Sequence, residues 1–469
     1  MCIINMTTTI DHASNSATVN LHTIAPGATV CDLRPGANTS NFTICLNTPS
    51  SFPPGGFRMH TLFPSDGGED TDPGCIRKTV DLVPIGIKAF MHSTRELTCI
   101  HHNDLVLFLE GHIFNLDALW NSHTSSSSTS SSSSTSSSKL GLLLNLYLTY
   151  GMDYLLQLLD GTFVMVLIDQ RPKLNESNMY VVSDRMGTRP LYTSTHHVDQ
   201  QSIYTISTEK HPSIGGTLLP MGCYETYTLP HVTQTRWHRG DPHMSKTNIH
   251  TYHALGRSGG LSNTMGSNAD IRNMLRYHLE CAVDKRFDAH RTTHVVCIAY
   301  PESPDDVEYQ VLCRILAKIC QQRHLTLECC VPCILKTTTT RATTPEPAEF
   351  AKKLMDSLVD PSTTRVFMPS IFMSVEKTII QQLTCWSNLT QNKCVSHPSI
   401  QYDYELRNEL RNMAANHLIP NVFEPFKSQG ILVEFPLLDA SWVDVYLSVN
   451  CQYRFGHPME ELYSHEYNV

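Results

Sequence analysis

The stretch LLDGTFVMVLID, residues 158–169, constrains the fold more than any other part of the chain. Its apolar run, FVMVLI, is short and bounded by polar residues, a pattern typical of a buried β-strand. Residues 140–159, which lead into it, carry apolar side chains at helical spacing instead. We do not expect this region to span a bilayer, because polar groups interrupt it at Asn145, Asp153 and Asp160.

Short apolar runs between polar turns recur through the first half of the chain, at residues 82–91, 104–114, 178–184 and 202–208. They predict a strand-rich domain over residues 1–229. Residues 5–68 are rich in Thr, Asn, Pro and Gly and are predicted to be irregular or partly disordered. The uninterrupted Ser/Thr tract 124–138 cannot bury a core, so it is predicted to be a solvent-facing insert within this domain.

The second half has a different apolar pattern. After a predicted linker over residues 230–268, amphipathic helices are expected at 269–287, 306–322, 347–359 and 404–418. A strand is predicted at 293–300, and an apolar segment follows at 431–439. This alternation indicates a second domain over residues 269–469 with an α/β or mainly helical fold.

Composition limits the classes of function. A length of 469 residues suits two or three domains, and a net charge of -9 gives no basic surface for nucleic acid. The start of the chain lacks the pattern of a secretory signal, which makes the cytoplasm the expected compartment and reduced thiols the expected state of the 16 cysteines. One CxxC spacing lies within Cys329–Cys333, but it has no second pair, so no metal site is predicted.

Several motifs of the first half, taken in order, resemble one known family. They are LEGHIFNLDAL, LYLTYGMDYLLQLLDGTFVMVLID, SDRMGTRPLY, TISTEKH and LPMGCYETYTL. Each is similar to a segment of the class II glutamine amidotransferase domain of glutamine-dependent asparagine synthetases. The resemblance implies an α+β domain built as an Ntn-type αββα sandwich over residues 1–229.

The second half resembles the ATP-pyrophosphatase synthetase domain of the same family. The similar segments are IAYPESPDD, DPSTTRVFMPSIFMS and SQGILVEFPLLDASWVD, with Asp360, Arg365 and Pro369 at the family's intervals. The resemblance implies a reduced α/β synthetase domain over residues 269–469. It also implies synthesis of asparagine from aspartate, glutamine and ATP, with magnesium as a cofactor.

The family's glutamine site gives a set of candidate residues. By resemblance Cys2 is the nucleophile, acting as an N-terminal residue after removal of Met1. The family stabilises the oxyanion with an Asn-Gly pair, where this chain has Glu110 and Gly111, and a carboxylate cannot donate that hydrogen bond. Asn115 remains as a candidate glutamine-binding residue. Lys139 stands where the family places an Asp for the substrate ammonium, so the charge is reversed.

The candidate ATP site departs further from the family. The pyrophosphate-binding loop SGGLDSS should lie between Phe287 and Ile298, but the intervening DAHRTTHVVC is too short to contain it. The similar SGGLSN at residues 258–263 precedes the wrong helix and is interpreted as linker. The family's later SGEGxDE segment, which contacts ATP and magnesium, has no counterpart. Ile298 alone remains as a candidate ATP-binding position.

Three functions remain open from the sequence. The chain is an asparagine synthetase homologue in which the lost groups predict weak or absent catalysis, or a non-catalytic scaffold or regulatory partner, or a glutaminase only. Glutamine, aspartate and ATP are the substrates that the resemblance implies. A homodimer or a complex with another protein is also expected, and neither nucleic acid nor a membrane is expected as a partner.

Overall fold

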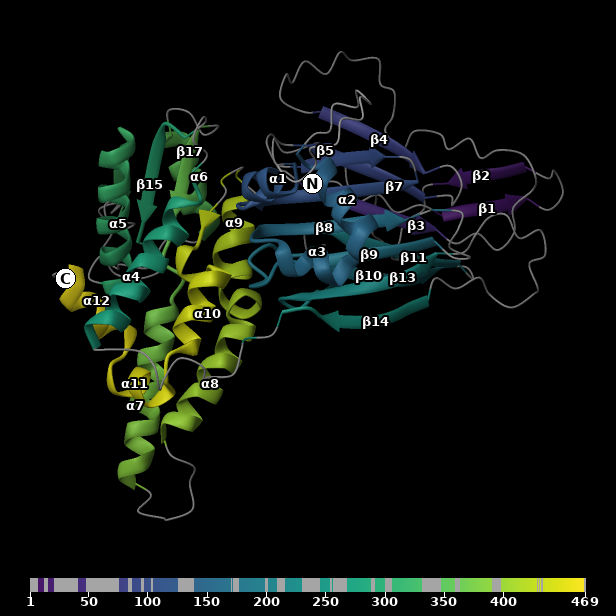
Figure 1. Ribbon diagram of the computed structural model, residues 1–469. Coiled ribbons are helices and arrows are strands. Elements are labelled where there is room, and N and C mark those ends of the chain that lie inside the picture. Colours follow the sequence, from purple (N-terminus) through teal and green to yellow (C-terminus); the bar gives the residue numbers. More distant parts are fainter. Residues whose placement is uncertain are drawn as a thin grey trace. The chain divides into compact units, whose positions relative to one another are not determined.

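The chain divides after His253 into two units, residues 1–253 and 254–469, which are described separately (Figure 1). The computed structural model describes the backbone of residues 7–11, 16–20, 41–47, 76–82, 87–93, 97–102, 104–124, 139–169, 171, 177–198, 201–208, 216–229, 245–253, 255, 268–287, 292–299, 306–330, 347–358, 363–389, 398–427, 429, 431 and 433–467. Antiparallel sheets in the first unit and a parallel sheet in the second give mixed α/β content, in line with the predicted α+β class.

The centre of unit 1 is a six-stranded antiparallel sheet. Its strands, in spatial order, are β14 (Ser245–Thr251), β13 (Cys223–Leu229), β9 (Ser177–Ser183), β8 (Gly161–Asp169), β7 (Leu105–Ile113) and β6 (Leu97–His102). The predicted buried strand at 163–168 is therefore confirmed as part of β8, which lies between β7 and β9.

Both faces of this sheet are buried at β7 and β8. Alternate residues of β7 and β8, among them Leu107 and Met165, form one hydrophobic cluster with helices α2 (Gly141–Tyr150) and α3 (Met152–Leu158). Residues of the opposite face, such as Phe108 and Val166, are equally inaccessible to solvent. A strand buried on both faces explains why this part of the sequence is continuously apolar.

The helix predicted over residues 140–159 is two helices. Gly151 separates α2 from α3 with φ of 84°, a left-handed conformation that glycine adopts without strain. Its N–H donates to the carbonyl oxygen of Tyr147 at 2.8 Å and closes the last turn of α2. A third helix among the described residues of this unit, α1 (Leu116–Thr124), directly follows β7.

A second six-stranded sheet in unit 1 has the order β12 (Thr217–Leu218), β10 (Tyr192–Val198), β11 (Gln201–Ser207), β3 (Asn41–Asn47), β5 (Ile87–Ser93) and β4 (Ile76–Leu82). The short strands β1 (Thr7–Asp11) and β2 (Ser16–Asn20) pair with each other. The prediction that residues 5–68 are irregular is thus wrong for three strands. Their pairing partners supply hydrogen bonds that the local Thr- and Asn-rich composition does not reveal.

The predicted linker over residues 230–268 is wrong in part, because β14 lies within it. This strand pairs with β13 at the edge of the central sheet, and its Ile249 is half exposed. An edge strand with a largely polar sequence, SKTNIHT, lacks the apolar run that marks an interior strand. The linker prediction otherwise lies largely outside the described residues.

Unit 2 contains a four-stranded parallel sheet in the order β16 (Thr326–Cys330), β15 (His294–Ile298), β17 (Thr364–Phe367) and β18 (Val433–Glu434). Its helices are α4 (Asn268–Asp284), α5 (Val307–Arg323), α6 (Pro347–Ser357), α7 (Phe372–Leu389), α8 (Pro398–Met413), η3 (Ala414–Phe423), α9 (Glu424–Lys427), η4 (Pro436–Leu438), α10 (Ala440–Ser448), α11 (Cys451–Gly456) and α12 (Met459–Tyr467). Figure 1 shows α5 alongside β15. The helices predicted at 269–287, 306–322 and 347–359, and the strand predicted at 293–300, are confirmed apart from their ends.

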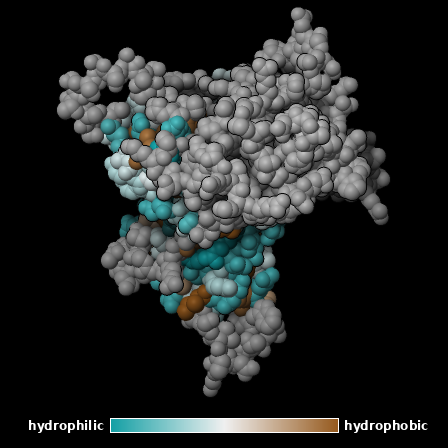
Figure 2. Space-filling view, turned by 90° about the vertical axis from the view of Figure 1, so that its right-hand side faces the viewer, coloured by the Kyte–Doolittle hydropathy of each residue, from teal (hydrophilic) through white to brown (hydrophobic). Residues whose placement is uncertain are grey.

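Large hydrophobic side chains are exposed at scattered positions, namely Leu148, Tyr150, Tyr154, Ile249, Tyr277, Ile400 and Tyr404. On the face drawn in Figure 2, the coloured residues are mainly hydrophilic, and the hydrophobic ones form small separate spots. Among the described residues, no helix has the length and apolar character needed to cross a membrane.

Candidate functional site

The Glu110-Gly111 pair lies near the end of β7. Glu110 is directly opposite Val164 of β8, which in turn is opposite Ser183 of β9, so the three residues form one cross-strand row. By the alternation of strand residues, this row lies on the face of the sheet away from α2 and α3. Glu110 and Ser183 are each only 1% exposed. A carboxylate side chain therefore occupies a buried position where the resemblance implies an amide donor.

Gly111 is held in a close backbone crossing. It has φ of 106°, and a Cβ atom there would lie 2.2 Å from the carbonyl oxygen of Thr162. Gly161 on β8 has the reciprocal constraint, since its Cβ would lie 2.2 Å from the carbonyl oxygen of His112. The two strands can approach this closely only because neither glycine has a side chain.

Asn115 binds the backbone of the turn that enters β8. Its Nδ2 donates to the carbonyl oxygen of Leu158 at 2.7 Å, and its Oδ1 accepts from the backbone N–H of Asp160 at 3.0 Å. The neighbouring Phe114 N–H donates to the carbonyl oxygen of Asp160 at 2.7 Å. These contacts give Asn115 a structural task, which is to join the end of β7 to the start of β8. Its predicted role in glutamine binding stays a prediction.

The turn after β9, SDRMGTRPLY, is organised around Asp184. Its buried carboxylate accepts hydrogen bonds from the backbone N–H groups of Met186 (2.9 Å), Thr188 (3.2 Å) and Arg189 (3.3 Å), and from the Thr188 hydroxyl (2.8 Å). Burial raises the pKa of Asp184, and these hydrogen bonds oppose that shift. One side chain thereby fixes a whole polar turn at the end of a buried strand.

Tyr252 and His253 close this turn from the C-terminal side of β14. The Tyr252 hydroxyl donates to the carbonyl oxygen of Ser183 at 2.7 Å, and the Tyr252 and His253 N–H groups both donate to the carbonyl oxygen of Gly222. Burial, together with the nearby charge of Arg185, lowers the pKa of His253 to about 4. His253 is therefore neutral at physiological pH. Sequence analysis missed these two residues, because they fall within the predicted linker.

Lys139, expected opposite the substrate ammonium, forms an exposed ion pair instead. Its Nζ lies 2.6 Å from Oδ1 of Asp117, which is in the first turn of α1. The side chains are 54% and 72% exposed, respectively. The pair joins α1 to the residues that precede α2, and so it links the two ends of the Ser/Thr tract, of which residues 125–138 lie outside the described residues.

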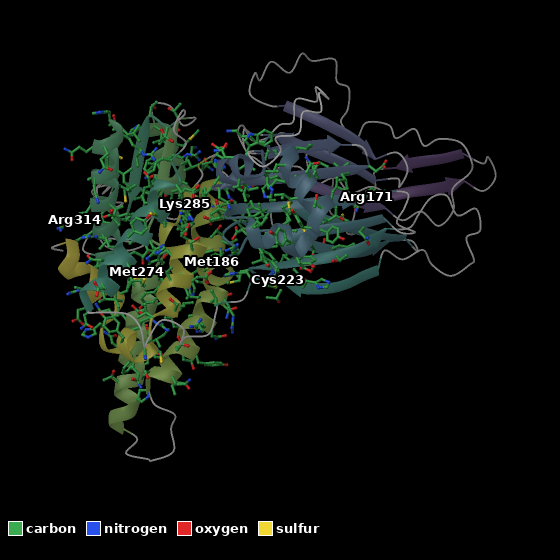
Figure 3. The ribbon with its side chains drawn as sticks, in the orientation of Figure 1. Arg171, Met186, Cys223, Met274, Lys285 and Arg314 are labelled. Carbon is green, nitrogen blue, oxygen red and sulfur yellow. The ribbon has the colours of Figure 1, made fainter. Side chains whose placement is uncertain are left out.

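A buried Tyr-Asp-Arg cluster that sequence analysis missed joins α2 to the end of β8. Asp169 is fully buried and accepts from the Tyr147 hydroxyl at 2.7 Å and from two nitrogens of Arg171, the closer also at 2.7 Å. Burial alone would raise the pKa of Asp169, but the hydrogen bonds from Arg171 and Tyr147 hold it below its ordinary value. Figure 3 labels Arg171 in unit 1. This cluster anchors the central strand to the helical layer.

The predicted nucleophile Cys2 has no described geometry, because it lies outside the described residues. The structure therefore brings together Glu110, Gly111 and Asn115 around the β7 and β8 crossing and places Lys139 at the start of α2.

In unit 2, the candidate position Ile298 is the last residue of β15 and is fully buried. Glu308, in the first turn of α5, reaches the segment that leads into α7. Its carboxylate accepts from the N–H and hydroxyl of Ser370, the latter at 2.8 Å, and from the N–H of Met373 at 3.1 Å. Burial, with a contribution from Asp306, raises the pKa of Glu308 to about 7. The amides at the start of α7 are thus bound to a carboxylate of the same chain.

A second buried charge cluster joins the end of α4 to β18 and α10. Asp439 caps α10 through the N–H of Trp442 and lies 3.0 Å from Nη1 of Arg286 and 2.7 Å from Nζ of Lys285. Arg286 Nε also lies 3.3 Å from Glu434 of β18. Burial alone would raise the pKa of Asp439, but Arg286 and Lys285 hold it below its ordinary value. Lys285 is labelled in Figure 3.

The magnesium ion that the resemblance implies stays a prediction. Within the described part of the chain, no group of three or more His, Cys, Asp or Glu side chains could hold a metal ion. Asp306 is the N-cap of α5 and accepts from the N–H of Tyr309 at 3.2 Å, while Glu308 is bound to the start of α7. These carboxylates do not fit a magnesium site in this arrangement. Cys333 of the CxxC spacing lies outside the described residues.

Comparison with known protein families identifies one domain. Residues 96–213 match the glutamine amidotransferase domain. The matched range begins just before β6, ends after β11 and includes Glu110, Gly111, Asn115, Lys139 and the Asp184 turn. Such a domain is associated with glutamine hydrolysis and amido transfer. The match spans about a quarter of the chain, and no curated protein matches the sequence.

Proposed function

We propose that this chain is a divergent relative of the glutamine-dependent asparagine synthetases, and that it keeps their scaffold with weak or absent catalysis. The glutamine amidotransferase match over residues 96–213 supports the first half of this proposal. Unit 1 has two six-stranded sheets and a helical layer, which suits an Ntn-type αββα sandwich. The parallel sheet and helices of unit 2 suit a reduced synthetase domain, for which the support is the resemblance alone.

The observation that carries the proposal is the burial of Glu110 beside Gly111. The amidotransferase reaction develops negative charge on the amide oxygen, which needs hydrogen-bond donors. A carboxylate accepts hydrogen bonds and repels an oxyanion. Loss of one donor costs about 10²–10³ in rate, and an added negative charge increases that cost. The reversed charge of Lys139, held by Asp117 at 2.6 Å, weakens recognition of the glutamine ammonium further.

The proposed loss of ATP use is supported by the contacts at the end of the parallel sheet. Ligands of open α/β sheets bind beyond the carboxyl ends of the strands, where helix N-termini offer free amides. In unit 2 the start of α7 follows β17 at this edge, and Glu308 accepts hydrogen bonds from its Ser370 and Met373 amides. The Glu308 carboxylate therefore occupies the backbone N–H groups that a phosphate group of ATP would need.

Glutamate release from glutamine tests the first half of the proposal. The wild-type protein and Cys2→Ala should release glutamate at the same background rate. Glu110→Asn restores an amide donor beside Gly111 and should raise the rate by about 10- to 100-fold if the rest of the pocket is intact. Asp104→Asn, an exposed change just before β7, is the matched control. Wild-type turnover that disappears in Cys2→Ala would overturn the proposal.

Calorimetry with ATP and magnesium tests the second half. We expect no saturable heat at millimolar nucleotide, with or without aspartate. Saturable binding would restore the asparagine synthetase reading of unit 2, and formation of pyrophosphate from ATP and aspartate would establish it.

Two other functions remain as candidates. The amidotransferase match favours a glutaminase that works without ATP, and Cys2-dependent glutamate release without nucleotide would identify it. The retained buried contacts of both units favour a scaffold or regulatory partner, either as a homodimer or with another protein. Sedimentation of the purified chain distinguishes a self-associating scaffold from a monomer.

A further inference from the structure

Three thiols meet in unit 2 at the edge of the parallel sheet. Cys297 on β15 and Cys329 on β16 are direct neighbours in the parallel register. The sulfur of Cys313 on α5 lies 3.4 Å from the sulfur of Cys329, and Cys297 is near enough to raise the pKa of Cys313. All three are free cysteines. No site argued above uses them.

The three thiols differ in access to solvent. Cys329 is exposed, Cys313 is half-buried and Cys297 is fully buried. β16 is the edge strand of the sheet, and no strand among the described residues pairs with its outer side. A reagent in solution can therefore reach Cys329, while Cys297 can react only with a thiol already inside the cluster.

The sulfur separation suits bond formation. A disulfide bond is about 2.0 Å long, so the sulfurs of Cys313 and Cys329 need to approach by about 1.4 Å. Cys313 is on a helix and Cys329 on a short edge strand, and rotation of the two side chains can supply a movement of this size. The geometry brings an exposed thiol and a resolving thiol into contact.

We propose that Cys313 and Cys329 are a redox modification site, which forms an intramolecular disulfide when the protein meets a small-molecule disulfide such as oxidised glutathione. The Cys329 thiolate attacks one sulfur of glutathione disulfide, forms a mixed disulfide and releases one glutathione thiolate, which takes up a proton. Cys313, after losing its proton to solvent, attacks the Cys329 sulfur and releases the second glutathione. Two protein thiols are oxidised, and one glutathione disulfide is reduced to two thiols.

The mutual hydrogen bonds of the thiols set the rate and the stability of this bond. The hydrogen bond to Cys297, with burial, raises the pKa of Cys313 to about 12, and the contact with Cys313 raises the pKa of Cys329. Few thiolates are present at neutral pH, so the reaction is slow there and accelerates as pH rises. The same effect deprives the reduced form of stabilisation by ionisation, so the disulfide resists reduction once it has formed.

The expected consequence is a covalent joint between the edge strand and α5. The joint closes a short loop that contains the end of α5 and the start of β16. Closing that loop restricts the unfolded chain and fastens β16 to the helix that covers it. Oxidation should therefore stabilise unit 2 without changing unit 1.

Peptide mapping of the full chain tests the proposal. The wild-type protein is incubated with oxidised glutathione at alkaline pH, alkylated and digested without reduction. We expect a cross-linked peptide pair that contains Cys313 and Cys329, with alkylation lost at both of these positions. In Cys313→Ser, a glutathione mixed disulfide should accumulate on Cys329, while Cys329→Ser should leave Cys313 unmodified. This asymmetry follows from the difference in exposure.

Two further variants serve as controls. Cys297→Ser removes the buried neighbour and should leave the cross-link intact, while Cys385→Ser removes an exposed cysteine on α7 and should also leave it intact. The proposal is overturned if wild-type Cys329 stops at the mixed disulfide, or if the cross-link joins Cys297 instead. If a serine variant fails to fold, the peptide map of the wild-type protein still shows whether Cys313 and Cys329 become cross-linked. Thermal unfolding of the wild-type chain gives a second measurement, with the midpoint of unit 2 expected to rise by several degrees after oxidation.

Discussion

Two buried carboxylates, Asp184 in unit 1 and Asp439 in unit 2, are satisfied in opposite ways. In unit 1, Asp184 is satisfied by groups no more than five residues along the chain, most of them backbone N–H groups. In unit 2, Asp439 is satisfied largely by side chains, including Arg286, which is 153 residues away in sequence. Glu308 likewise binds Ser370, 62 residues away. A local turn holds the first kind of site together, and tertiary packing holds the second.

This difference indicates how much stability a substitution at each kind of buried carboxylate site should cost. A change at Asp184 disturbs one turn and leaves the sheet pairings of unit 1 in place. A change at Arg286 or Glu376 removes contacts between segments that are far apart in sequence. Glu376 shows this most clearly, because it accepts from the hydroxyls of Tyr402 and Tyr446 and, at 2.8 Å, from the N–H of Met459. We therefore expect larger losses of stability from buried charges in unit 2.

The largest effect is expected for Arg286→Met. The substitution leaves Asp439 and Glu434 buried with Lys285 as the nearest cation, and removing one partner of a buried ion pair costs about 3–5 kcal/mol. Urea unfolding of the full chain should show the transition of unit 2 at lower denaturant while that of unit 1 keeps its midpoint. Arg411→Met on the exposed side of α8 is the control. Equal midpoints for the two variants would contradict the assigned role of the cluster.

A smaller loss is expected for Asp184→Ala. Three backbone N–H groups and the Thr188 hydroxyl lose their acceptor in a buried turn, which costs about 2–3 kcal/mol. Asp184→Asn retains one acceptor oxygen and should lose about half as much, while the exposed Asp104→Ala should lose almost nothing. Unfolding followed by tryptophan fluorescence or circular dichroism measures the three values. If Asp184→Ala loses as much stability as Arg286→Met, the distinction between a locally held carboxylate and one held by tertiary packing is wrong.

Glu308→Gln should change how stability depends on pH. Because the pKa of Glu308 rises from 4.5 to about 7 on folding, its contribution is fully present below about pH 4.5 and is lost as pH rises through about 7. The wild-type chain should lose about 2–3 kcal/mol of unit 2 stability between about pH 5 and 8, and the variant should lose less. Urea midpoints across this range test it, with the exposed Glu349→Gln as the control. If the stability of wild type and Glu308→Gln changes with pH in the same way, Glu308 is not the source of the pH dependence.

The smallest effect is expected for Lys139→Ala. Its ion pair with Asp117 is exposed on both sides, and such pairs contribute about 0–1 kcal/mol. A double-mutant cycle with Asp117→Ala isolates the interaction, which should disappear in high salt. A coupling above about 1.5 kcal/mol would show that the link between α1 and α2 is more important than its exposure indicates.

The sequence was sufficient for features that depend on neighbouring residues. The run from Phe163 to Ile168 predicts β8 because an interior strand needs apolar residues on both faces. The polar turn that begins at Ser183 is readable for the same local reason. Gly151 shows the limit of this approach, since helical spacing continues across it while its backbone conformation ends α2.

Features that depend on distant partners could not be predicted in the same way. β14 has a polar sequence and becomes a strand only through its pairing with β13. The contact between Glu308 and Ser370 joins two segments 62 residues apart in sequence, yet nothing in either segment indicates the other. Asn115 was expected to face a substrate, and its hydrogen bonds to Leu158 and Asp160 arise from a turn more than 40 residues later.

The crossing of β7 and β8 at Gly111 and Gly161 has a consequence for tracing distant homologues. Each glycine makes room for the other strand's carbonyl group, so a side chain at either position forces the ladder apart regardless of which residue remains at its counterpart. A substitution at one glycine therefore does not make a substitution at the other glycine easier to accommodate. A search that requires both glycines at this spacing, and ignores the substituted residue at position 110, should recover remote members that retain the architecture after their chemistry has diverged.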